Sequence, residues 1–360
     1  MPSKGQIVHH SEESEPSEPP RIEDFNWNNK CHVISAIACL VEAVYILSHE
    51  ESSLALRWYD NLNFKFILVS WLIDENDKSI FGATFEYKGE SLPNIPQFVI
   101  AFRGTILKGK TAKEDLKLDR LCLANRLHKS SRFQKAKNYI EHMVDLHGGE
   151  RVWVAGHSLG AAIALLAGKE IAKKTTDTSK RIEAYLFNPP FCSDLIMRWF
   201  KNEFVKLGVQ LAKNGLKLIL SHFGEDHKDQ EAQANDTLAF NALSNWVPHI
   251  FVHPNDIFCS AYIDYFQSRQ KMLEIGFRKL EKVAAMKTMR MLLGMDSSSE
   301  AMHLLPSAIL TINKVEFPRE TEGFFDKFGR KGSAHELKQW WNPNSSYEFQ
   351  DHIRKYNPPN

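Results

Sequence analysis

The sequence has little cysteine and no regular cysteine spacing. Its 360 residues include five cysteines, and no Cys-x-x-Cys pair occurs among Cys31, Cys39, Cys122, Cys192 and Cys259. An odd number without paired spacing argues against a disulfide framework and against a zinc site built on cysteine pairs. The pattern predicts reduced thiols in an intracellular protein.

An excess of charge of either sign is also missing. Lys and Arg number 45 against 44 Asp and Glu, which gives a formal net charge of +1. Domains that bind nucleic acid usually carry a marked basic excess, so we expect no nucleic acid partner. The histidines lack the spacing of a zinc ligand set, and no Gly-rich nucleotide-binding motif occurs. We therefore expect no metal and no cofactor.

Long apolar runs are absent too. No stretch reaches about 18 consecutive apolar residues, the length typical of a membrane span. The first residues are polar, acidic and rich in Ser, Pro and Glu, without the apolar core of a signal peptide. We expect residues 1–24 to form a disordered tail. The expected location is the cytoplasm, with association to a membrane surface left open.

The sequence does contain segments with helical spacing of apolar residues that alternate with short segments typical of strands. Residues 30–48 and 132–147 carry apolar residues at helical spacing. Two β-rich runs, 63–73 and 79–89, flank a polar turn and predict an antiparallel hairpin. Further short apolar runs typical of buried strands lie at 97–105, 151–156, 181–190, 249–258 and 305–313.

This alternation predicts an α/β fold with a mostly parallel sheet flanked by helices. We expect one domain over residues 25–350, with helical insertions near 191–247 and 265–302, because both segments exceed an ordinary crossover connection. Residues 268–292 combine apolar and basic side chains. A helix packed on the domain is the favoured interpretation, and contact with an anionic membrane or a partner is the alternative.

The motif Gly156-x-Ser158-x-Gly160 lies in VWVAGHSLGAAIALLAG, residues 152–168. It fits a nucleophile elbow, a sharp turn from a strand into a helix that exposes a serine hydroxyl at the edge of the sheet. Glycines two positions before and after the serine remove the Cβ atoms that would clash in such a turn. An ordinary tight turn in an α/β core is the alternative interpretation.

This segment and FVIAFRGT, residues 98–105, together resemble the class 3 lipase family, the fungal-type lipases with an α/β-hydrolase fold. The similarity extends over about residues 30–345 and is greatest to a plant branch labelled GDSL esterase/lipase. That label fits this chain poorly, because it contains no Gly-Asp-Ser-Leu. The resemblance implies hydrolysis of a lipid or small ester.

Acyl transfer develops negative charge on the carbonyl oxygen, which backbone N–H donors stabilise. One donor is expected at Leu159, directly after the serine. The resemblance implies that the second comes from Thr105, the residue that follows Arg103 and Gly104. His157 is expected to support the site by packing and hydrogen bonding.

A catalytic serine needs a base that an acid orients, and in this fold the chain order is serine, acid, histidine. Asp256 follows a predicted strand, where α/β sheets place their functional residues, and is the preferred acid. An aspartate in a simple turn is the alternative interpretation of Asp256, and Asp264 is the fallback acid.

Three histidines follow the proposed acid: His303, His335 and His352. His335 precedes a short segment with a tryptophan pair, and the family's catalytic histidine likewise precedes a short aromatic segment near the C-terminus. His335 is therefore the preferred base. His303 stands before a predicted strand, at the wrong end for catalysis, and is the alternative base.

The sequence thus predicts a serine carboxylester hydrolase that uses Ser158, His335 and Asp256 and forms an acyl-enzyme. Two alternatives stay open: an interaction or signalling module without turnover, because fold does not fix function, and a thioesterase or phospholipase-type acyl hydrolase. A lid would come from 106–120 or 268–292. The expected partner is a lipid or small ester substrate, and contact with a peripheral membrane surface is left open.

Overall fold

The computed structural model describes the chain in segments. These are residues 19–20, 22, 24–49, 55, 58–59, 65–90, 92–106, 112–123, 126–174, 181–191, 241–274, 276, 281, 302–316, 334–341 and 350–354. Most of the predicted tail, 1–24, and most of the predicted insertions, 191–247 and 265–302, lie outside these residues.

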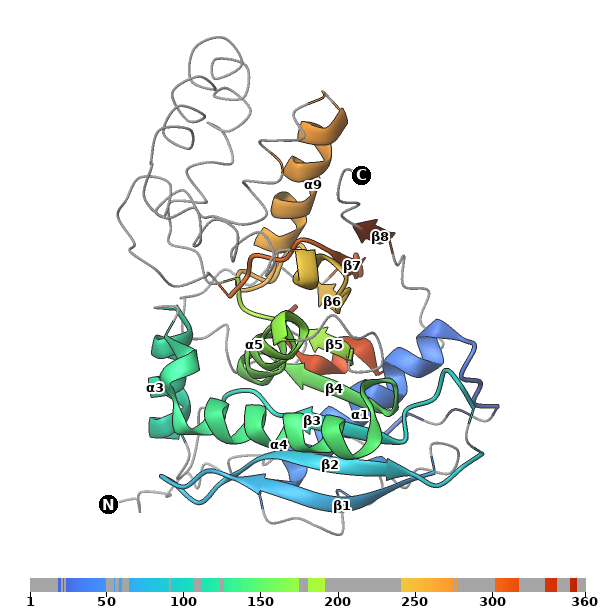
Figure 1. Ribbon diagram of the computed structural model, residues 1–360, viewed down its shortest axis with the longest axis vertical. Helices are drawn as coiled ribbons and strands as arrows, with labels where there is room; N and C mark the ends of the chain where they lie inside the picture. The colour runs from blue at the N-terminus through green and yellow to red at the C-terminus, as the bar shows by residue number, and fades with distance from the viewer. Residues whose placement is uncertain are drawn as a thin grey trace, which may run out of the picture.

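One eight-stranded sheet forms the centre of the molecule, with its strands in the order of the chain (Figure 1). Strands β3 to β7 are parallel, β2 is antiparallel to both of its neighbours, and β8 is antiparallel to β7. The strands are β1 (Phe66–Ile73), β2 (Ile80–Tyr87), β3 (Phe98–Phe102), β4 (Val152–His157), β5 (Glu183–Phe187), β6 (His249–Val252), β7 (Ala308–Ile312) and β8 (Gln350–Arg354).

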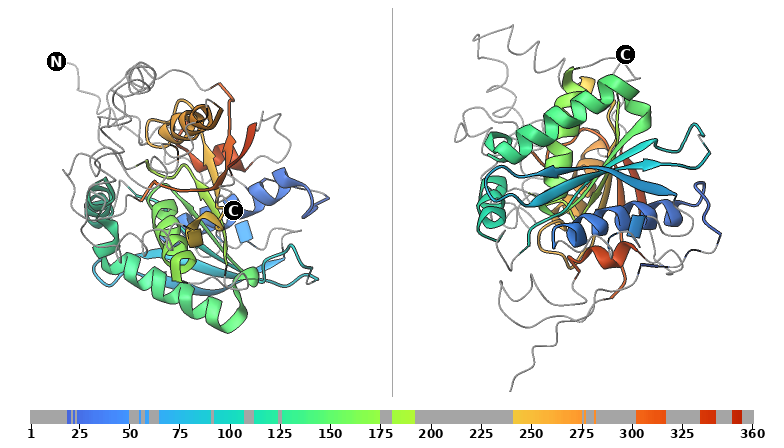
Figure 2. Two further views of the ribbon diagram at one scale, coloured as in Figure 1. Left: turned by 45° about the horizontal axis from the view of Figure 1, so that its top comes forward. Right: turned by 90° about the horizontal axis from the view of Figure 1, so that it is seen from below.

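The helices divide between the two faces of this sheet. Each parallel connection advances one strand in the same direction, and right-handed crossovers then place the connecting helices on one face. Figure 2 shows α4 on that face, with α1 and η6 on the other. Leu118 of α3 packs in the same hydrophobic core as α4. The described helices are α1 (Lys30–Leu47), α3 (Ala112–Leu123), α4 (Ser131–His147), α5 (Leu159–Lys174) and α9 (Ala261–Glu274), with short 3₁₀ turns η1 (Leu127–Lys129), η2 (Gly149–Arg151) and η6 (Leu337–Trp340).

Each face of the sheet has its own hydrophobic core. Successive side chains of a strand point to opposite faces. Val152 and Val154 of β4 accordingly belong to the core beneath α4 and α5, whereas Trp153 and Ala155 belong to the core beneath α1. The parallel strands are buried on both faces, which is why they occur in the sequence as continuous apolar runs.

Helix α1 is long and apolar enough to cross a membrane by length and composition, but 72% of that window is buried inside the protein. It packs on β2, β3 and β4. Its burial identifies it as the helix that covers the second face of the sheet.

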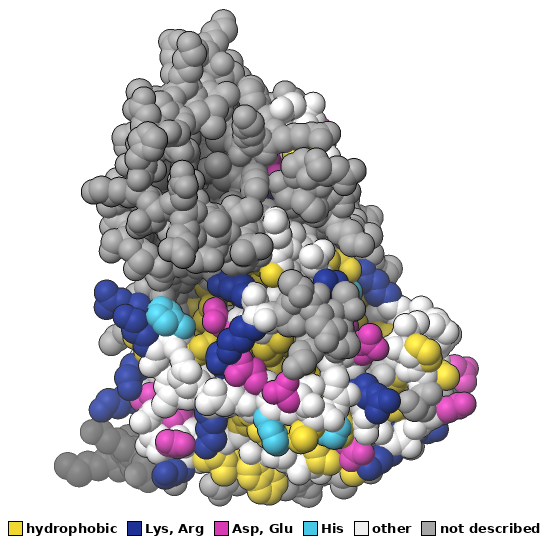
Figure 3. All heavy atoms as spheres, in the orientation of Figure 1, with side chains coloured by type: hydrophobic (Ala, Val, Ile, Leu, Met, Phe, Trp, Pro, Cys, Tyr) yellow, Lys and Arg dark blue, Asp and Glu magenta, His cyan; other side chains and the backbone are white. Residues whose placement is uncertain are grey.

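The predicted hairpin, the five buried strands and the helices at 30–48 and 132–147 are confirmed. Helix α3 and strand β8 were not among the predicted elements. On the surface, Ile67, Val69 and Trp71 of the edge strand β1 are 40%, 44% and 52% exposed. Figure 3 shows hydrophobic side chains along the lower border, where β1 lies.

Candidate active site

Polar residues follow four neighbouring parallel strands at their carboxyl ends. Arg103 follows β3, Ser158 follows β4 and Asn188 follows β5, while Asp256 lies four residues beyond the end of β6. The carboxyl edge of a parallel sheet is where α/β proteins build their sites. The topology therefore brings these residues to one edge.

Ser158 lies in a sharp turn between β4 and α5, with a φ of 53°. A Cβ atom on Gly156 would lie 2.4 Å from the carbonyl carbon of Gly160. A Cβ atom on Gly160 would in turn lie 2.4 Å from the carbonyl oxygen of Phe102. Both positions need glycine, and the predicted elbow geometry is present.

A continuous hydrogen-bond chain joins the three predicted side chains. Nε2 of His335 lies 2.9 Å from Oγ of Ser158, and Nδ1 of His335 lies 2.8 Å from Oδ2 of Asp256. Carboxylate oxygens only accept, so Nδ1 carries a hydrogen. In neutral His335 the lone pair on Nε2 then faces the serine hydroxyl, which donates to it.

Burial and the ion pair act in opposite directions on these two groups. Burial opposes the ionisation of Asp256, but the adjacent His335, together with the hydrogen bonds that the carboxylate accepts, holds its pKa below the usual value. Burial also disfavours the charged form of His335, but the Asp256 carboxylate raises the pKa of the imidazole above its usual value. The site therefore stabilises an imidazolium beside an aspartate anion.

Asp256 has further partners that the sequence analysis missed. Its Oδ2 accepts from Nδ2 of Asn188 at 2.7 Å and from the thiol of Cys259 at 3.0 Å. Its Oδ1 accepts from the backbone N–H of Phe258 at 2.9 Å. Asn188 itself accepts from Nε1 of Trp340 at 2.8 Å. The position of Asn188 directly after a buried strand was the available signal.

The backbone after β3 lies against the elbow. A Cβ atom on Gly104 would lie 2.8 Å from the carbonyl oxygen of His157 and 2.9 Å from Cβ of Ser158. The Gly104 carbonyl accepts from Nη1 of Arg103 at 2.7 Å. In a trans peptide the C=O and the following N–H point in opposite directions, so this bond orients the Thr105 N–H away from the guanidinium.

Helix α3 anchors the same loop through two carboxylates. Oδ2 of Asp115 accepts from Nη1 of Arg103 and from the N–H of Ile106, both at 2.8 Å. Asp119, one turn later, accepts from the Thr105 hydroxyl at 2.8 Å. Burial raises the pKa of Asp119 to about 6. Arg103, Thr105 and Ile106 are thus each held by a contact with α3.

Leu159 is the first residue of α5. The first N–H groups of a helix have no partner within the helix, and the helix dipole adds partial positive charge there. The Leu159 N–H therefore lies directly after Ser158 at an end of α5 that favours negative charge.

The alternative histidines His303 and His352 and the fallback acid Asp264 lie elsewhere. The His303 ring packs on Phe191, with centroids 4.2 Å apart. Asp264 lies in the first turn of α9, and His352 lies on β8.

Both nitrogens of His157 form hydrogen bonds, to the Tyr45 hydroxyl and to the carbonyl of His335. This geometry fits the supporting role expected for His157.

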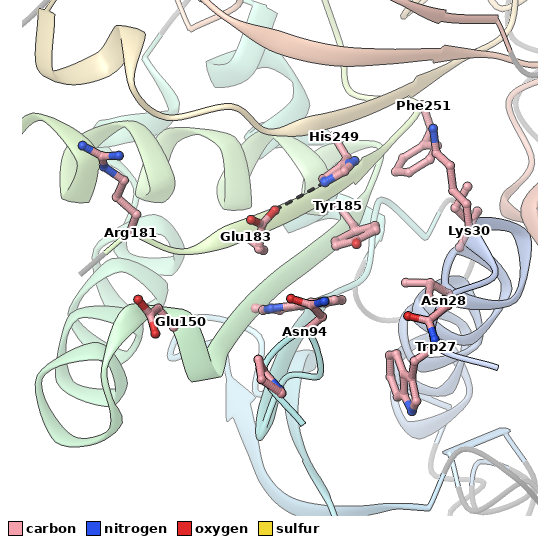
Figure 4. Close-up of a pocket in the computed structure, with 14 residues that line it drawn as sticks. Trp27, Asn28, Lys30, Asn94, Glu150, Arg181, Glu183, Tyr185, His249 and Phe251 are labelled. Atoms are coloured by element: carbon pink, nitrogen blue, oxygen red, sulfur yellow. Dashed lines mark ion pairs between the residues drawn. The ribbon is translucent and has the colours of Figure 1, made fainter. Parts of the chain in front are cut away.

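A cavity of about 500 Å³ lies at the opposite, amino end of the strands (Figure 4). Trp153, Tyr185 and Phe251 line it, and His249 forms an ion-pair contact with Glu183 there at 3.3 Å. It holds none of the residues around Ser158. Within the described parts of the chain, no group of three or more His, Cys, Asp or Glu is placed to hold a metal ion.

Known proteins resemble this chain in sequence and in structure. Residues 99–212 match the model of the family described as Lipase (class 3). A GDSL esterase/lipase of Arabidopsis thaliana is 35% identical over 349 residues, which cover 92% of this chain and 94% of the relative.

Two solved lipases are more distant. A lipase of Rhizopus microsporus var. chinensis matches with a TM-score of 0.35 and 15% identity, over 68% of this chain and 74% of that one. The extracellular lipase LipA of Serratia marcescens matches with a TM-score of 0.31 and 14% identity, over 48% and 39%.

Proposed function

The chain belongs to the class 3 lipase family and has its α/β-hydrolase fold, and from that premise we propose a serine esterase acting through Ser158, His335 and Asp256. The family supports hydrolysis of a lipid or other ester. The observation that carries the finer proposal is the continuous hydrogen-bond chain from Oγ of Ser158 through His335 to Asp256. Nucleophile, base and orienting acid in hydrogen-bond contact are what acyl transfer requires.

In the proposed reaction, Oγ of Ser158 attacks the ester carbonyl while Nε2 of His335 takes its proton. Asp256 stabilises the imidazolium that forms. The backbone N–H groups of Thr105 and Leu159 donate to the developing oxyanion, and each such donor contributes about 10²–10³ in rate. His335 then protonates the leaving alcohol, and a water molecule, deprotonated by the same nitrogen, cleaves the acyl-enzyme.

A fluorophosphonate probe tests this proposal directly, because it reacts with a serine only where the base and the oxyanion donors are in place. We expect the folded wild type to form an adduct on Ser158, found by mass spectrometry, and Ser158→Ala to form none. Absence of the adduct on folded wild type would exclude the hydrolase and favour an interaction module.

The base is tested with a matched pair of histidine variants. His335→Ala is expected to lower p-nitrophenyl butyrate turnover by at least about a hundredfold. His303→Ala, which removes a buried histidine packed on Phe191, is expected to keep the turnover of its folded fraction. The reverse pattern would transfer the role to His303.

A further inference from the structure

A partly buried tyrosine and a buried histidine connect the loop after β3 with the loop that carries His335. Tyr45 belongs to α1, and its hydroxyl accepts from the N–H of Gly104 at 2.7 Å. The same hydroxyl lies 2.7 Å from Nδ1 of His157. Nε2 of His157 lies 2.8 Å from the backbone carbonyl oxygen of His335. Four segments, namely α1, the loop after β3, the end of β4 and the loop of His335, therefore meet through these two residues.

The chemistry of the partners fixes every donor in this chain. The His335 carbonyl can only accept, so Nε2 of His157 carries a hydrogen and donates. Burial and the nearby His335 lower the pKa of His157 to about 3, so its ring is neutral. Nδ1 then has a lone pair and accepts from the Tyr45 hydroxyl. All polar groups along the chain are satisfied in one arrangement of hydrogens.

The packing around the phenol leaves little freedom. A Cβ atom on Gly104 would lie 2.5 Å from the Tyr45 hydroxyl, so the backbone before Thr105 and the phenol are in close contact. Burial raises the pKa of Tyr45 far above its usual value, so the hydroxyl keeps its proton. The uncharged rings of Tyr45 and His157 thus form a rigid connection between the backbone before Thr105 and the backbone of His335.

We propose that Tyr45 and His157 are positioning residues that fix the Thr105 N–H relative to Nε2 of His335. This inference rests on the proposed ester hydrolysis. The oxyanion donor and the base act on the same tetrahedral intermediate, so a small error in their separation costs rate. Substrate binding does not depend on this separation. The bridge therefore acts on kcat and leaves KM nearly unchanged.

Tyr45→Phe tests the bridge, because it removes the hydroxyl and keeps the ring in the core. We expect kcat toward p-nitrophenyl butyrate to fall by about tenfold, with KM changed less than about twofold. Active sites are titrated with the fluorophosphonate probe, so that kcat refers to folded, reactive protein. Tyr185→Phe is the matched control: Tyr185 belongs to the α1-side core against which Tyr45 packs, but its hydroxyl faces the cavity at the amino end of the strands (Figure 4).

A double-mutant cycle separates the bridge from two independent packing effects. His157→Gln is expected to lower kcat as Tyr45→Phe does, and the double variant is expected to lose no more than the worse single variant, because both break one connection. Losses that multiply, or a Tyr45→Phe variant with a lower Tm and an unchanged kcat per titrated site, would overturn the proposal. A wild type that forms no adduct would instead refute the proposed function itself.

Discussion

Ser158 has a backbone conformation that its residue type disfavours. Its φ of 53° lies in the left-handed region, where a side chain costs about 1–3 kcal/mol. The hydrogen bond from the Ser158 N–H to the carbonyl of Phe187, at 3.0 Å, helps to hold the turn. The elbow therefore exposes the hydroxyl at the expense of stability.

This strain predicts an unusual order of stability. Ser158→Gly should be more stable to urea than Ser158→Ala by about 0.5–1 kcal/mol, although glycine loses more conformational entropy on folding. Both variants should be inactive. At Ser70, in the extended strand β1, the order should be the usual one, with alanine more stable. An alanine variant at 158 that matched or exceeded the glycine variant would show that the turn is unstrained.

The raised pKa of His335 predicts the acid side of the pH–rate profile. The base works only when neutral, and Asp256 favours its protonated form, so kcat/KM should fall as pH drops through a midpoint above about 6.5. Asp256→Asn removes the stabilising anion. Its midpoint should therefore shift to lower pH, and its plateau should fall by at least about a hundredfold.

The control for this profile is Asp264→Asn, a change in the first turn of α9. It should leave both the midpoint and the plateau as in the wild type. A profile with the same midpoint in Asp256→Asn and the wild type would assign the titration to another group.

Within the candidate site, the sequence could identify those residues that lie in a recognisable motif or at a characteristic position along the predicted fold. The Ser158 motif, the position of Asp256 after a strand and the chain order that favoured His335 selected three side chains that do lie in hydrogen-bond contact. Asn188 had a positional signal of the same kind, directly after a buried strand, but was not selected. Tyr45 had none, because it lies inside the apolar helix α1 and its contact with Gly104 exists only once α1 packs on the sheet.

At the scale of the elements, a buried ladder of alternating charges joins the hairpin to the site. Asp74 follows β1 and accepts from Nε of Arg132 in α4 at 2.7 Å. Nη1 of Arg132 donates to Asp115 of α3 at 2.8 Å. Asp115 also pairs with Arg103 at 2.8 Å, and the side chains of both are fully buried. The position of α3 thus depends on α4 and the hairpin.

Removing one member of this ladder leaves a buried charge without compensation. Arg132→Met should lower the free energy of unfolding by about 3–5 kcal/mol, measured by urea denaturation. Lys135→Met on the same helix removes a solvent-exposed ion pair with Glu75 at 3.6 Å and should cost no more than about 1 kcal/mol. Equal losses in the two variants would refute the structural role of the ladder.

Helix α3 and strand β8, which the sequence did not predict, lack the strong periodic pattern of apolar residues found in the predicted helices and strands. Helix α3 carries three basic and three acidic side chains among its 12 residues, and one of the carboxylates is buried. With so many charged residues, 106–120 suggested a lid. Asp115 and Asp119, one turn apart, were the signal for a helix anchored on the loop after β3. Strand β8 pairs with β7 only, and its sequence QDHIR has no apolar run from which a buried strand could be predicted.

At the scale of the whole molecule, the two cores share the same strands. A change beneath α1 and a change beneath α5 should therefore weaken one cooperative unit. Ile37→Ala and Ile163→Ala, at sites 0% and 1% exposed, should each lower the free energy of unfolding by about 2–5 kcal/mol.

The measurement follows helix content by circular dichroism and the burial of tryptophans by fluorescence. Trp58, Trp153, Trp340 and Trp341 belong to the α1-side core, whereas Trp246 belongs to the other core. In each variant the two signals should shift together to one lower urea midpoint. A fluorescence transition that moved in Ile37→Ala while the helix signal stayed in place would show two separable units.

The segment 334–341 packs beside α1 and fills the remainder of the α1-side core, on the face of the sheet opposite the crossover helices. The Ser35 hydroxyl of α1 donates to the carbonyl of Trp341, the rings of Trp58 and Trp341 lie 4.5 Å apart, and the same segment carries His335. On the ribosome this segment emerges after strands β1 to β7. A nascent chain therefore seals its second core and acquires its proposed base in the same late event, so premature termination would yield a product that is both incompletely packed and inert.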